Sequence, residues 1–563
     1  MKRTIFHALL LIMGIFSVFG PEVMGKEYYL YDAEVNQISY MSSSERSFSK
    51  SFSLEKRPKY LLRTFNPDKF LVIFNPEEDT ENQENSHPGQ MLIYNTTTGR
   101  SEDLVELGYL PYWWQYTKDG KHFFIAYKPT PKSQQLELLH YNIEEMKAER
   151  LTNFAEAVYD LTLSEDESRL LALIKNEQQD TPEMVSLSYN PLEVKTSLLV
   201  GKFPDRIYNL SDELAIVVCV DRRTIHERET DDGTVSREKG LIQLVDLSSN
   251  SILEEQEIQP KTTFLNWHEK ERVLIVVAGT TSYTGIGVFG STEVFKVSVD
   301  GIKRHLIKRG WIDYDYLPEK DTLYILTQKS YYNGYLNIVD FTNNSIKEYK
   351  TGKNAFVIQT GSYTATVYTY SLFHFPGIPY EIIACPLNGN TRFFDINTNK
   401  IQAEIKGVNT FFSSANSDKT TSFITISPNL SEYNVLYQSK KEVSIYDQNI
   451  KELKVIKLKE KPLGIYQITK PSSPTIVATE KCIYLLNNED DTMVPIHQFT
   501  EKAKEITFYN GGNKIIVWSD KELLVIDITT FKVNTHLDLY GKSGEGLSRV
   551  KSGEQRYYFL RDL

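Results

Sequence analysis

Residues 113–127 read WWQYTKDGKHFFIAY, and residues 138–149 read LLHYNIEEMKAE. Each stretch contains an apolar, strand-like run followed by a short polar turn with Asp, Asn or Gly, and then a second strand-like run. This arrangement is typical of a β-hairpin, because alternating apolar residues bury one face of a strand. The Asp or Asn side chain hydrogen-bonds the backbone of the turn that it opens. We therefore predict two consecutive hairpins, or four strands, within residues 113–149.

The second of these hairpins recurs along the chain. We find eleven copies of its pattern, mostly at intervals of about 40 to 57 residues. Clear copies begin at Tyr29, Leu92, Leu138, Ile242, Leu336, Arg392, Val443 and Leu523, and weaker copies at Val185, Glu293 and Ile483. The first hairpin fills the intervals, as in LLRTFNPDKFLVIF from Leu61 and ITFYNGGNKIIVWS from Ile506. Two hairpins per repeat make a four-stranded unit of the size of a β-propeller blade.

Two short motifs carry a family resemblance. The turn YTKDGKHFF (116–124) and the strand end IYNTTTGR (93–100) resemble motifs of the WD-repeat-like superfamily, particularly its TolB-type and YVTN-type bacterial members. The resemblance extends over nearly all of 28–560 and implies an all-β, β-propeller fold of about eleven four-stranded repeats. The sequence lacks the Gly-His and Trp-Asp pair of WD repeats, Asp boxes and Kelch double glycines. The resemblance therefore implies an architecture and transfers no functional residue.

Eleven repeats exceed the four to eight blades that are typical of one propeller ring. We therefore predict two propellers in tandem, over 26–300 and 301–563, with one large ring as the alternative. The first strands after residue 26 match the second hairpin of a repeat, and residues 547–560 match the first hairpin. The two ends of the chain are thus expected to complete one blade together.

Residues 1–25 have the three parts of a secretory signal peptide. Lys2 and Arg3 form a positive start, an apolar run covers 8–19, and Val23 and Gly25 are small enough for a cleavage site. An uncleaved anchor is the alternative, but the apolar run is short for a membrane span. We predict export to the periplasm or the medium, with no membrane span in the mature chain.

Composition and motif searches limit the chemistry. The net charge of -11 argues against nucleic-acid binding. Cys219, Cys385 and Cys482 each lie in an apolar run, which predicts buried thiols. The ten histidines show no zinc spacing, EEDTEN (77–82) lacks calcium-loop spacing, and GKSGEG (541–546) matches neither a P-loop nor a nucleophile elbow. We therefore predict no cofactor and no metal site.

Long polar insertions separate the two hairpins of successive repeats. They lie at 75–90, 128–136, 176–184, 222–240 and 279–292, whereas the corresponding links at 438–442, 480–482 and 519–522 are nearly absent. In a propeller these links all emerge on one face. Long loops on a rigid scaffold often bind partners, although tolerated surface insertions would give the same pattern.

Two insertions stand out by their residue types. RRTIHERETDDGTVSREKG (222–240) places arginines in an acidic protein, and TTSYTGIGVFGST (280–292) places aromatic residues among glycines. Aromatic residues and arginine commonly anchor interfaces. The candidate binding residues are Arg222, Arg223, His226, Tyr283 and Phe289. The aromatic segment SLFHFPGIPY (371–380) is a further candidate.

These observations predict an exported β-propeller binding or scaffold protein that recognises a protein, peptide or glycan through one loop face. Two alternatives stay open at this point. One is a hydrolase or lactonase-like enzyme with its site at the mouth of a ring, and the other is a structural component of the envelope. Catalytic sites on a shared fold come from scattered positions, so the sequence does not decide between them.

Overall fold

A computed structural model covers the chain. It describes residues 27–32, 37–42, 50–54, 58–66, 69–76, 87–95, 98–176, 181–221, 239–259, 262–279, 282–284, 287–330, 333–352, 355–360, 364–369, 371–374, 380–384, 390–398, 400–406, 422–426, 432–437, 440–447, 451–466, 475–487, 492–499, 502–509, 514–519, 522–527, 532–538 and 558–560. The predicted signal peptide (1–25), the acidic run 77–82, Cys385 and the segment 541–546 lie outside these residues.

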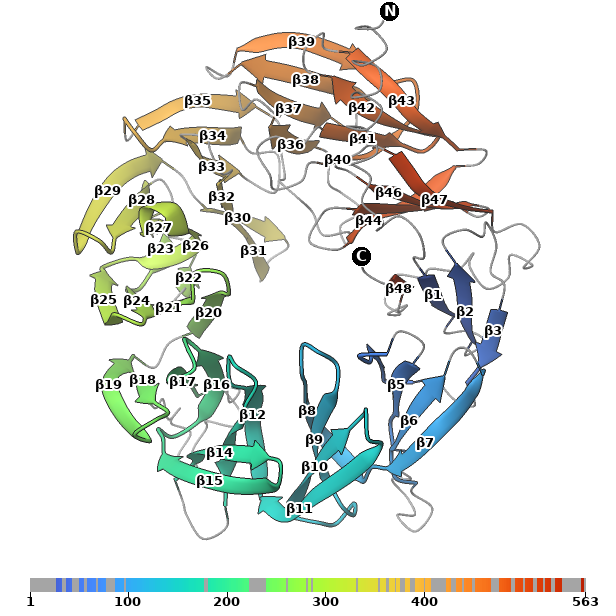
Figure 1. Cartoon of the computed structure of the whole chain (residues 1–563). Coiled ribbons are helices and arrows are strands. Elements are labelled where there is room, and N and C mark those ends of the chain that lie inside the picture. Colours follow the sequence, from blue (N-terminus) through green and yellow to red (C-terminus); the bar gives the residue numbers. More distant parts are fainter. Residues whose placement is uncertain are drawn as a thin grey trace, which may run out of the picture. The chain divides into compact units, whose positions relative to one another are not determined.

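The described residues form eleven four-stranded antiparallel sheets and two separate two-stranded hairpins (Figure 1). In ten of the sheets the four strands follow one another in chain order. A single turn of 3-10 helix over Pro318–Lys320 interrupts the pattern. The prediction of an all-β fold with about eleven four-stranded repeats is confirmed. No helix in the described part of the chain is long and apolar enough to span a membrane.

The chain divides into two compact units, of which unit 2 is Pro58–Leu372. Its first three sheets are β4 (Tyr60–Arg63), β5 (Lys69–Phe74), β6 (Gln90–Asn95) and β7 (Arg100–Glu106); β8 (Tyr109–Tyr116), β9 (His122–Lys128), β10 (Leu136–Asn142) and β11 (Lys147–Ala155); and β12 (Ala157–Leu163), β13 (Leu170–Lys175), β14 (Glu183–Tyr189) and β15 (Leu192–Leu199).

The next three sheets of unit 2 are β16 (Pro204–Asn209), β17 (Leu214–Cys219), β18 (Gly240–Asp246) and β19 (Ser251–Ile258); β20 (Thr262–His268), β21 (Val273–Gly279), β24 (Thr292–Ser298) and β25 (Gly301–Ile307); and β26 (Gly310–Leu317), β27 (Thr322–Ser330), β28 (Asn333–Asp340) and β29 (Ser345–Gly352). The hairpins are β22 (Ser282–Thr284) with β23 (Gly287–Phe289), and β30 (Ala355–Thr360) with β31 (Thr364–Thr369). The predicted boundary near residue 300 falls between β24 and β25, and the number of rings stays a prediction.

Unit 1 comprises Met1–Arg57 and Phe373–Leu563. Its sheets after residue 370 are β32 (Ser371–His374), β33 (Tyr380–Ala384), β34 (Asn390–Asp395) and β35 (Lys400–Lys406); β36 (Ser422–Ile426), β37 (Glu432–Tyr437), β38 (Glu442–Asp447) and β39 (Glu452–Lys457); β40 (Pro462–Tyr466), β41 (Thr475–Thr479), β42 (Cys482–Asn487) and β43 (Thr492–Gln498); and β44 (Ala503–Tyr509), β45 (Lys514–Ser519), β46 (Glu522–Asp527) and β47 (Lys532–Asp538).

The fifth sheet of unit 1 joins the two ends of the chain. It contains β1 (Glu27–Asp32), β2 (Gln37–Ser42), β3 (Lys50–Ser53) and β48 (Tyr558–Leu560), in the order β3-β2-β1-β48. Tyr29 pairs with Phe559 in an antiparallel register. The described residues therefore place three N-terminal strands and one C-terminal strand in this sheet, whereas the sequence pattern suggested one hairpin from each end.

The core of unit 2 lies in the seams between successive sheets. Phe124 and Leu138 pack with Leu161, Leu170 and other side chains across the seam between the β8–β11 and β12–β15 sheets. Similar buried clusters fill the four other seams of the unit. Apolar surface leaves water only when sheets face one another, so each sheet needs its neighbours for stability.

The position of a strand in its sheet explains its composition. The second strands are nearly all apolar and buried, as in VLIVVAG of β21, because sheets cover both of their faces. The fourth strands consist mostly of exposed and half-buried residues, as in LEVKTSLL of β15. Cys219, at the end of β17, and Cys482 are buried free thiols, which confirms the prediction for these two residues. Burial raises the pKa of the Cys219 thiol to about 12.

Candidate binding face

The sheets of unit 2 have two different ends. Because neighbouring strands are antiparallel, the turns from first to second strand and from third to fourth strand lie at the same end, which we call the turn end. The links from second to third strand, and those from one sheet to the next, lie at the opposite end, which we call the link end. First strands of successive sheets lie side by side, since β12 contacts both β8 and β16 (Figure 1).

The turns from third to fourth strand share one local structure. Asp246 accepts hydrogen bonds from the backbone N–H groups of Ser248 and Ser249, at 2.8 and 3.1 Å. Asn142 does the same for the next residues of its own turn. Four residues after each of these side chains, Asn250 and Met146 adopt a left-handed backbone with φ of 51° and 52°. The predicted role of Asp and Asn in opening these turns is confirmed.

In two of the turns that join a first strand to a second strand, a hydroxyl side chain donates a hydrogen bond to an Asp two residues later. The Thr117 hydroxyl donates to Asp119 at 2.7 Å, and the Ser164 hydroxyl donates to Asp166 at 2.6 Å. Burial opposes ionisation of Asp166, but hydrogen bonds from Ser164 and Ser168 outweigh it and lower the pKa. Both carboxylates therefore hold their own turns rather than a ligand.

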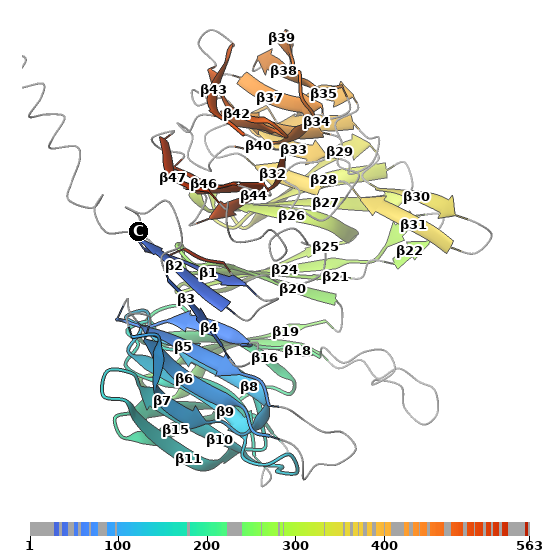
Figure 2. The ribbon, with the colours of Figure 1, turned by 90° about the vertical axis from the view of Figure 1, so that its right-hand side faces the viewer.

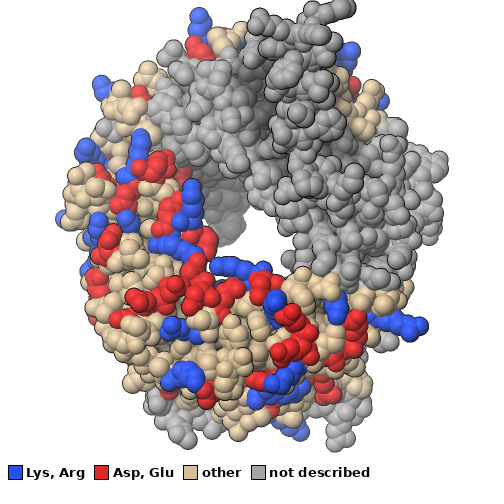
Figure 3. Space-filling model, viewed as in Figure 1, with Lys and Arg blue, Asp and Glu red and all other residues tan. Residues whose placement is uncertain are grey.

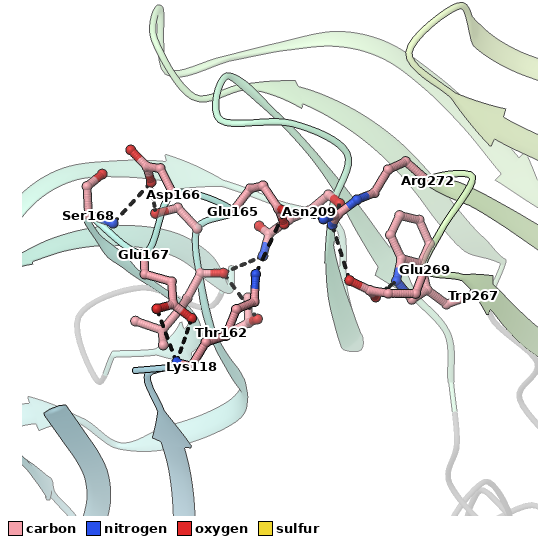
Figure 4. A network of polar contacts seen from close by, with 12 residues as sticks. Lys118, Thr162, Glu165, Asp166, Glu167, Ser168, Asn209, Trp267, Glu269 and Arg272 are labelled. Carbon is pink, nitrogen blue, oxygen red and sulfur yellow. Dashed lines mark hydrogen bonds and ion pairs between the residues drawn. The ribbon is translucent and has the colours of Figure 1, made fainter. Parts of the chain in front are cut away.

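A network of polar contacts joins four consecutive sheets at the turn end (Figure 4). The backbone N–H of Lys118 donates to both carboxylate oxygens of Glu167, at 2.9 and 3.1 Å. Arg272, in the turn between β20 and β21, forms an ion pair with Glu165 and donates to the backbone carbonyl of Asn209 at 3.3 Å. Each turn is thus tied to a turn or strand end of a neighbouring sheet.

Charged side chains of both signs are interleaved on the described part of unit 2 seen in Figure 3. At the turn end several of them are already paired, such as Lys121 with Glu144 at 2.8 Å and Lys296 with Asp321 at 2.6 Å. These contacts make the turn end a cross-linked structural surface.

The link end is built differently. Its links between second and third strands span 75–89, 129–135, 176–182, 220–239 and 280–291 in five successive sheets, and only 331–332 in the sixth. The described link 129–135 is a compact turn in which the Ser133 hydroxyl donates to the carbonyl of Gln135 at 2.7 Å. The hairpins β22–β23 and β30–β31 project on the same side of unit 2 (Figure 2).

The predicted binding residues fall partly on described elements. Tyr283 lies on β22 and pairs with Val288, and Phe289 lies on β23 and pairs with Ser282. The hairpin contacts β27 through β23. Arg222, Arg223 and His226 lie outside the described residues. Of the aromatic segment 371–380, residues 371–374 form β32 and Tyr380 begins β33, while 375–379 lie outside the described residues.

An aromatic and cationic group lies near the hairpin, at the link end of the β20–β25 and β26–β29 sheets. Phe264 is 44% exposed and meets the ring of Trp311 edge to face, with centroids 4.7 Å apart. The guanidinium of Arg309 lies 3.8 Å from the centroid of the Tyr335 ring. A Cβ at Gly279, where the chain leaves β21 for the hairpin, would come within 2.2 Å of the Trp311 ring.

The sequence did not reveal this group. Its members are distant in the chain and meet only because β20 and β26 belong to adjacent sheets. The only available signal was the position of Phe264 and Trp311 near the starts of first strands. Such aromatic residues also occur in ordinary propeller cores, so the pattern was not specific.

A buried carboxylate elsewhere in unit 2 is engaged with protein partners. Asp160, on the first strand β12, is buried and accepts a hydrogen bond from the backbone N–H of Ile207 at 2.8 Å, with Arg206 at 3.4 Å from the other oxygen. Burial raises its pKa despite these contacts. Among the residues that the structure describes, no group of three or more His, Cys, Asp or Glu could hold a metal ion.

Comparisons with known proteins give no family for this chain. No known protein family and no curated protein matches the sequence. The chain is similar to the β-propeller domain of the Trilobed protease from Pyrococcus furiosus, with 11% identity, a TM-score of 0.30, and coverage of 62% of this chain and 96% of that one. It is also similar to the β-propeller domain of Cps50 (Swd1) from Myceliophteria thermophila, with 11% identity, a TM-score of 0.28, and coverage of 58% and 93%. The repeated four-stranded sheets give this chain a β-propeller fold.

Proposed function

We propose that this protein is an exported β-propeller that binds a protein or peptide partner at the link end of unit 2. The observation that carries the proposal is the group formed by Phe264, Trp311, Arg309 and Tyr335. It combines an exposed aromatic ring with a rigidly packed one and a guanidinium that lies over a third ring and pairs with Glu348. The neighbouring β22–β23 hairpin carries Tyr283 and Phe289 in its backbone ladder.

The chemistry of this group supports a protein partner. Aromatic and arginine side chains contribute most of the binding energy at many protein interfaces, especially when their own surroundings are already ordered. Trp311 is 8% exposed and so gives Phe264 a fixed support. The exposed Phe264 ring would lose its contact with water when a partner covers it.

Export is the second part of the proposal. It rests on the predicted signal peptide, residues 1–25, with cleavage after Gly25. The buried free thiols of Cys219 and Cys482 are compatible with an oxidising compartment, because neither is accessible to a second thiol. Sequencing the N-terminus of the protein from the medium or periplasm tests this part, and a chain beginning at Met1 would contradict it.

Affinity capture with the mature chain, followed by titration of a purified partner, tests the binding face. Phe264→Ser and Arg309→Ser should each weaken the partner by about tenfold or more. Glu144→Gln, at the turn end, is the matched control and should leave the affinity unchanged. Equal binding by all three variants would place the interface elsewhere. A partner whose bonds are cleaved during the titration would favour the enzyme alternative.

A further inference from the structure

Four aromatic rings close the seam between the β8–β11 and β12–β15 sheets at the turn end. His140, on β10, stacks on Phe124 with centroids 4.9 Å apart and lies 5.2 Å from the ring of His122, on β9. Tyr189, at the end of β14 in the next sheet, lies within 5.3 Å of all three rings. His140 is 5% exposed and His122 is half-buried, so the His140 imidazole is the shielded member of the pair.

The two imidazoles touch through their nitrogens. Nδ1 of His122 lies 3.0 Å from Nε2 of His140. One nitrogen must therefore carry the hydrogen while the other offers its lone pair, and two N–H groups cannot face each other at this distance. The remaining nitrogen of His140, Nδ1, is buried without a hydrogen-bond partner. The two rings share the proton that lies between Nδ1 of His122 and Nε2 of His140. The closed seam offers no acceptor for a second, added proton on Nδ1 of His140.

The charged groups around the pair do not offset the cost of placing a second proton on it. Glu149 lies opposite His140 on β11, but it is shared with Lys147 at 2.7 Å and with the backbone N–H of Leu192 at 3.3 Å. Asp119 interacts with His122 from the turn that precedes β9. Burial, and then the neighbouring His122, lower the pKa of His140 to about 4, although Glu149 acts in the opposite direction.

The ring stack is attached to the cross-linked turns. The Tyr189 hydroxyl donates to the backbone carbonyl of Glu167. The carboxylate of Glu167 in turn accepts the backbone N–H of Lys118 from the adjacent sheet. Burial, and then the nearby charges of Glu167, Asp119 and Asp166, raise the pKa of Tyr189, so this phenol stays a hydrogen-bond donor. Separation of the rings would therefore release the two turns 117–121 and 164–169.

We propose that the His122–His140 pair is an acid-sensitive latch that holds the turn end of this seam closed and opens when a second proton enters the pair. The sign follows from proton binding. The open form binds the second proton more readily than the closed form, so acid favours opening. The closed seam is fully held above the ordinary pKa of histidine and is lost progressively as the pH falls from 6.5 toward about 4.

Hydrogen exchange on the full-length protein tests the latch. After correction for intrinsic exchange rates, protection of the amides in 117–121 and 164–169 should fall by at least about tenfold between about pH 7.5 and about pH 4.5. Amides of β27 and β28 should change far less. An unchanged ratio between the two regions would overturn the proposal.

Two variants separate the latch from general acid destabilisation. His140→Phe keeps a ring on Phe124 and should abolish the pH dependence of the two turns. His305→Phe is the matched control, because His305 is also buried against an aromatic ring, Phe341, with an unpartnered Nε2. It should keep the wild-type pH dependence.

A third variant covers the case in which His140→Phe does not fold. His122→Gln removes the neighbouring imidazole that lowers the pKa of His140, so the loss of protection between about pH 7.5 and about pH 4.5 should become smaller. A loss of unchanged size in His122→Gln, or a pH dependence that survives in His140→Phe, would show that the pair is not the latch.

Discussion

The turn end and the link end of unit 2 join the same strands in opposite ways. At the turn end, side chains such as Asp246 fold back on their own turns, and others such as Arg272 reach the next sheet. At the link end, the connection between second and third strands ranges from 331–332 to 220–239 without a change in the sheets that it joins. Among the described residues, the polar contacts that join turns of different sheets therefore lie at the turn end, whereas the links of the other end differ widely in length.

This difference has a physical origin. A short turn between antiparallel strands leaves backbone groups that only nearby side chains can satisfy, so Asp, Asn, Ser and Thr are required there. A longer link can reach water with its own backbone, and its closure entropy grows slowly with length. Insertions are therefore tolerated at the link end.

The largest effect is expected at Gly120 in the turn between β8 and β9. Its φ of 71° is left-handed, and a Cβ there would lie 2.6 Å from the backbone nitrogen of Phe65, which donates to the Gly120 carbonyl at 3.0 Å. Gly120→Ala should lower the local opening free energy by about 2–3 kcal/mol. Native-state hydrogen exchange at Phe65 measures it, with Lys118→Ala as the control. Equal protection in both variants would mean that this turn does not hold the neighbouring one.

Arg272 should have the next largest effect. Its side chain is 26% exposed and joins Glu165, Glu269 and the carbonyl of Asn209. Arg272→Ala should reduce the opening free energy of the β20–β21 turn by about 1–2 kcal/mol, a value limited by partial exposure to water. Lys270→Ala, two residues away, is the control. A double-mutant cycle with Glu165→Gln isolates the cross-sheet pair, and a coupling energy of zero would contradict the cross-linked turn end.

How much of the difference between the two ends can be predicted from the sequence depends on how far apart in the chain the contacting residues lie. The hairpins, the eleven repeats and the role of Asp246 follow from patterns within a few residues, so they could be predicted. The contacts of Lys118 with Glu167 and of Arg272 with Asn209 join residues 49 and 63 positions apart. Their charges are common on any surface, and no periodicity indicates which of them meet.

The candidate site shows the same limit. The position of the long links could be predicted, because an insertion interrupts a repeat visibly. Phe264 and Trp311 could not be paired, because their contact depends on the packing of two sheets. His122 and His140 belong to neighbouring strands, yet their nitrogen contact depends on diagonal placement across the ladder, where His140 lies opposite Phe124. A strand pattern gives the face of a side chain and does not give this offset.

A smaller effect is expected in the turn between β28 and β29, where the Asp340 carboxylate holds its own turn. Asp340 accepts the backbone N–H and the side-chain amide of Asn343, at 2.9 and 2.7 Å. Asp340→Ala should lower the opening free energy of this turn by about 1 kcal/mol, as for the loss of a helix cap. Asn344→Gly is the control, since φ is 50° there and glycine adopts it freely. A loss that spreads to the neighbouring sheet would show that third-to-fourth-strand turns are also cross-linked.

The smallest effect is expected at the link end. A substitution there tests the difference between the turn end and the link end most directly. Residues 130–134 form a turn that Ser133 closes on itself, with Thr130, Lys132 and Gln134 exposed. Replacing them by an equally long Gly-Ser segment should change the opening free energy of β9 and β10 by less than about 0.5 kcal/mol, because their ladder and the seam beneath them stay intact. Hydrogen exchange of both strands measures this change. A loss as large as that of Arg272→Ala would mean that the link end also fixes the sheets, and its long links would then be structural rather than free to bind.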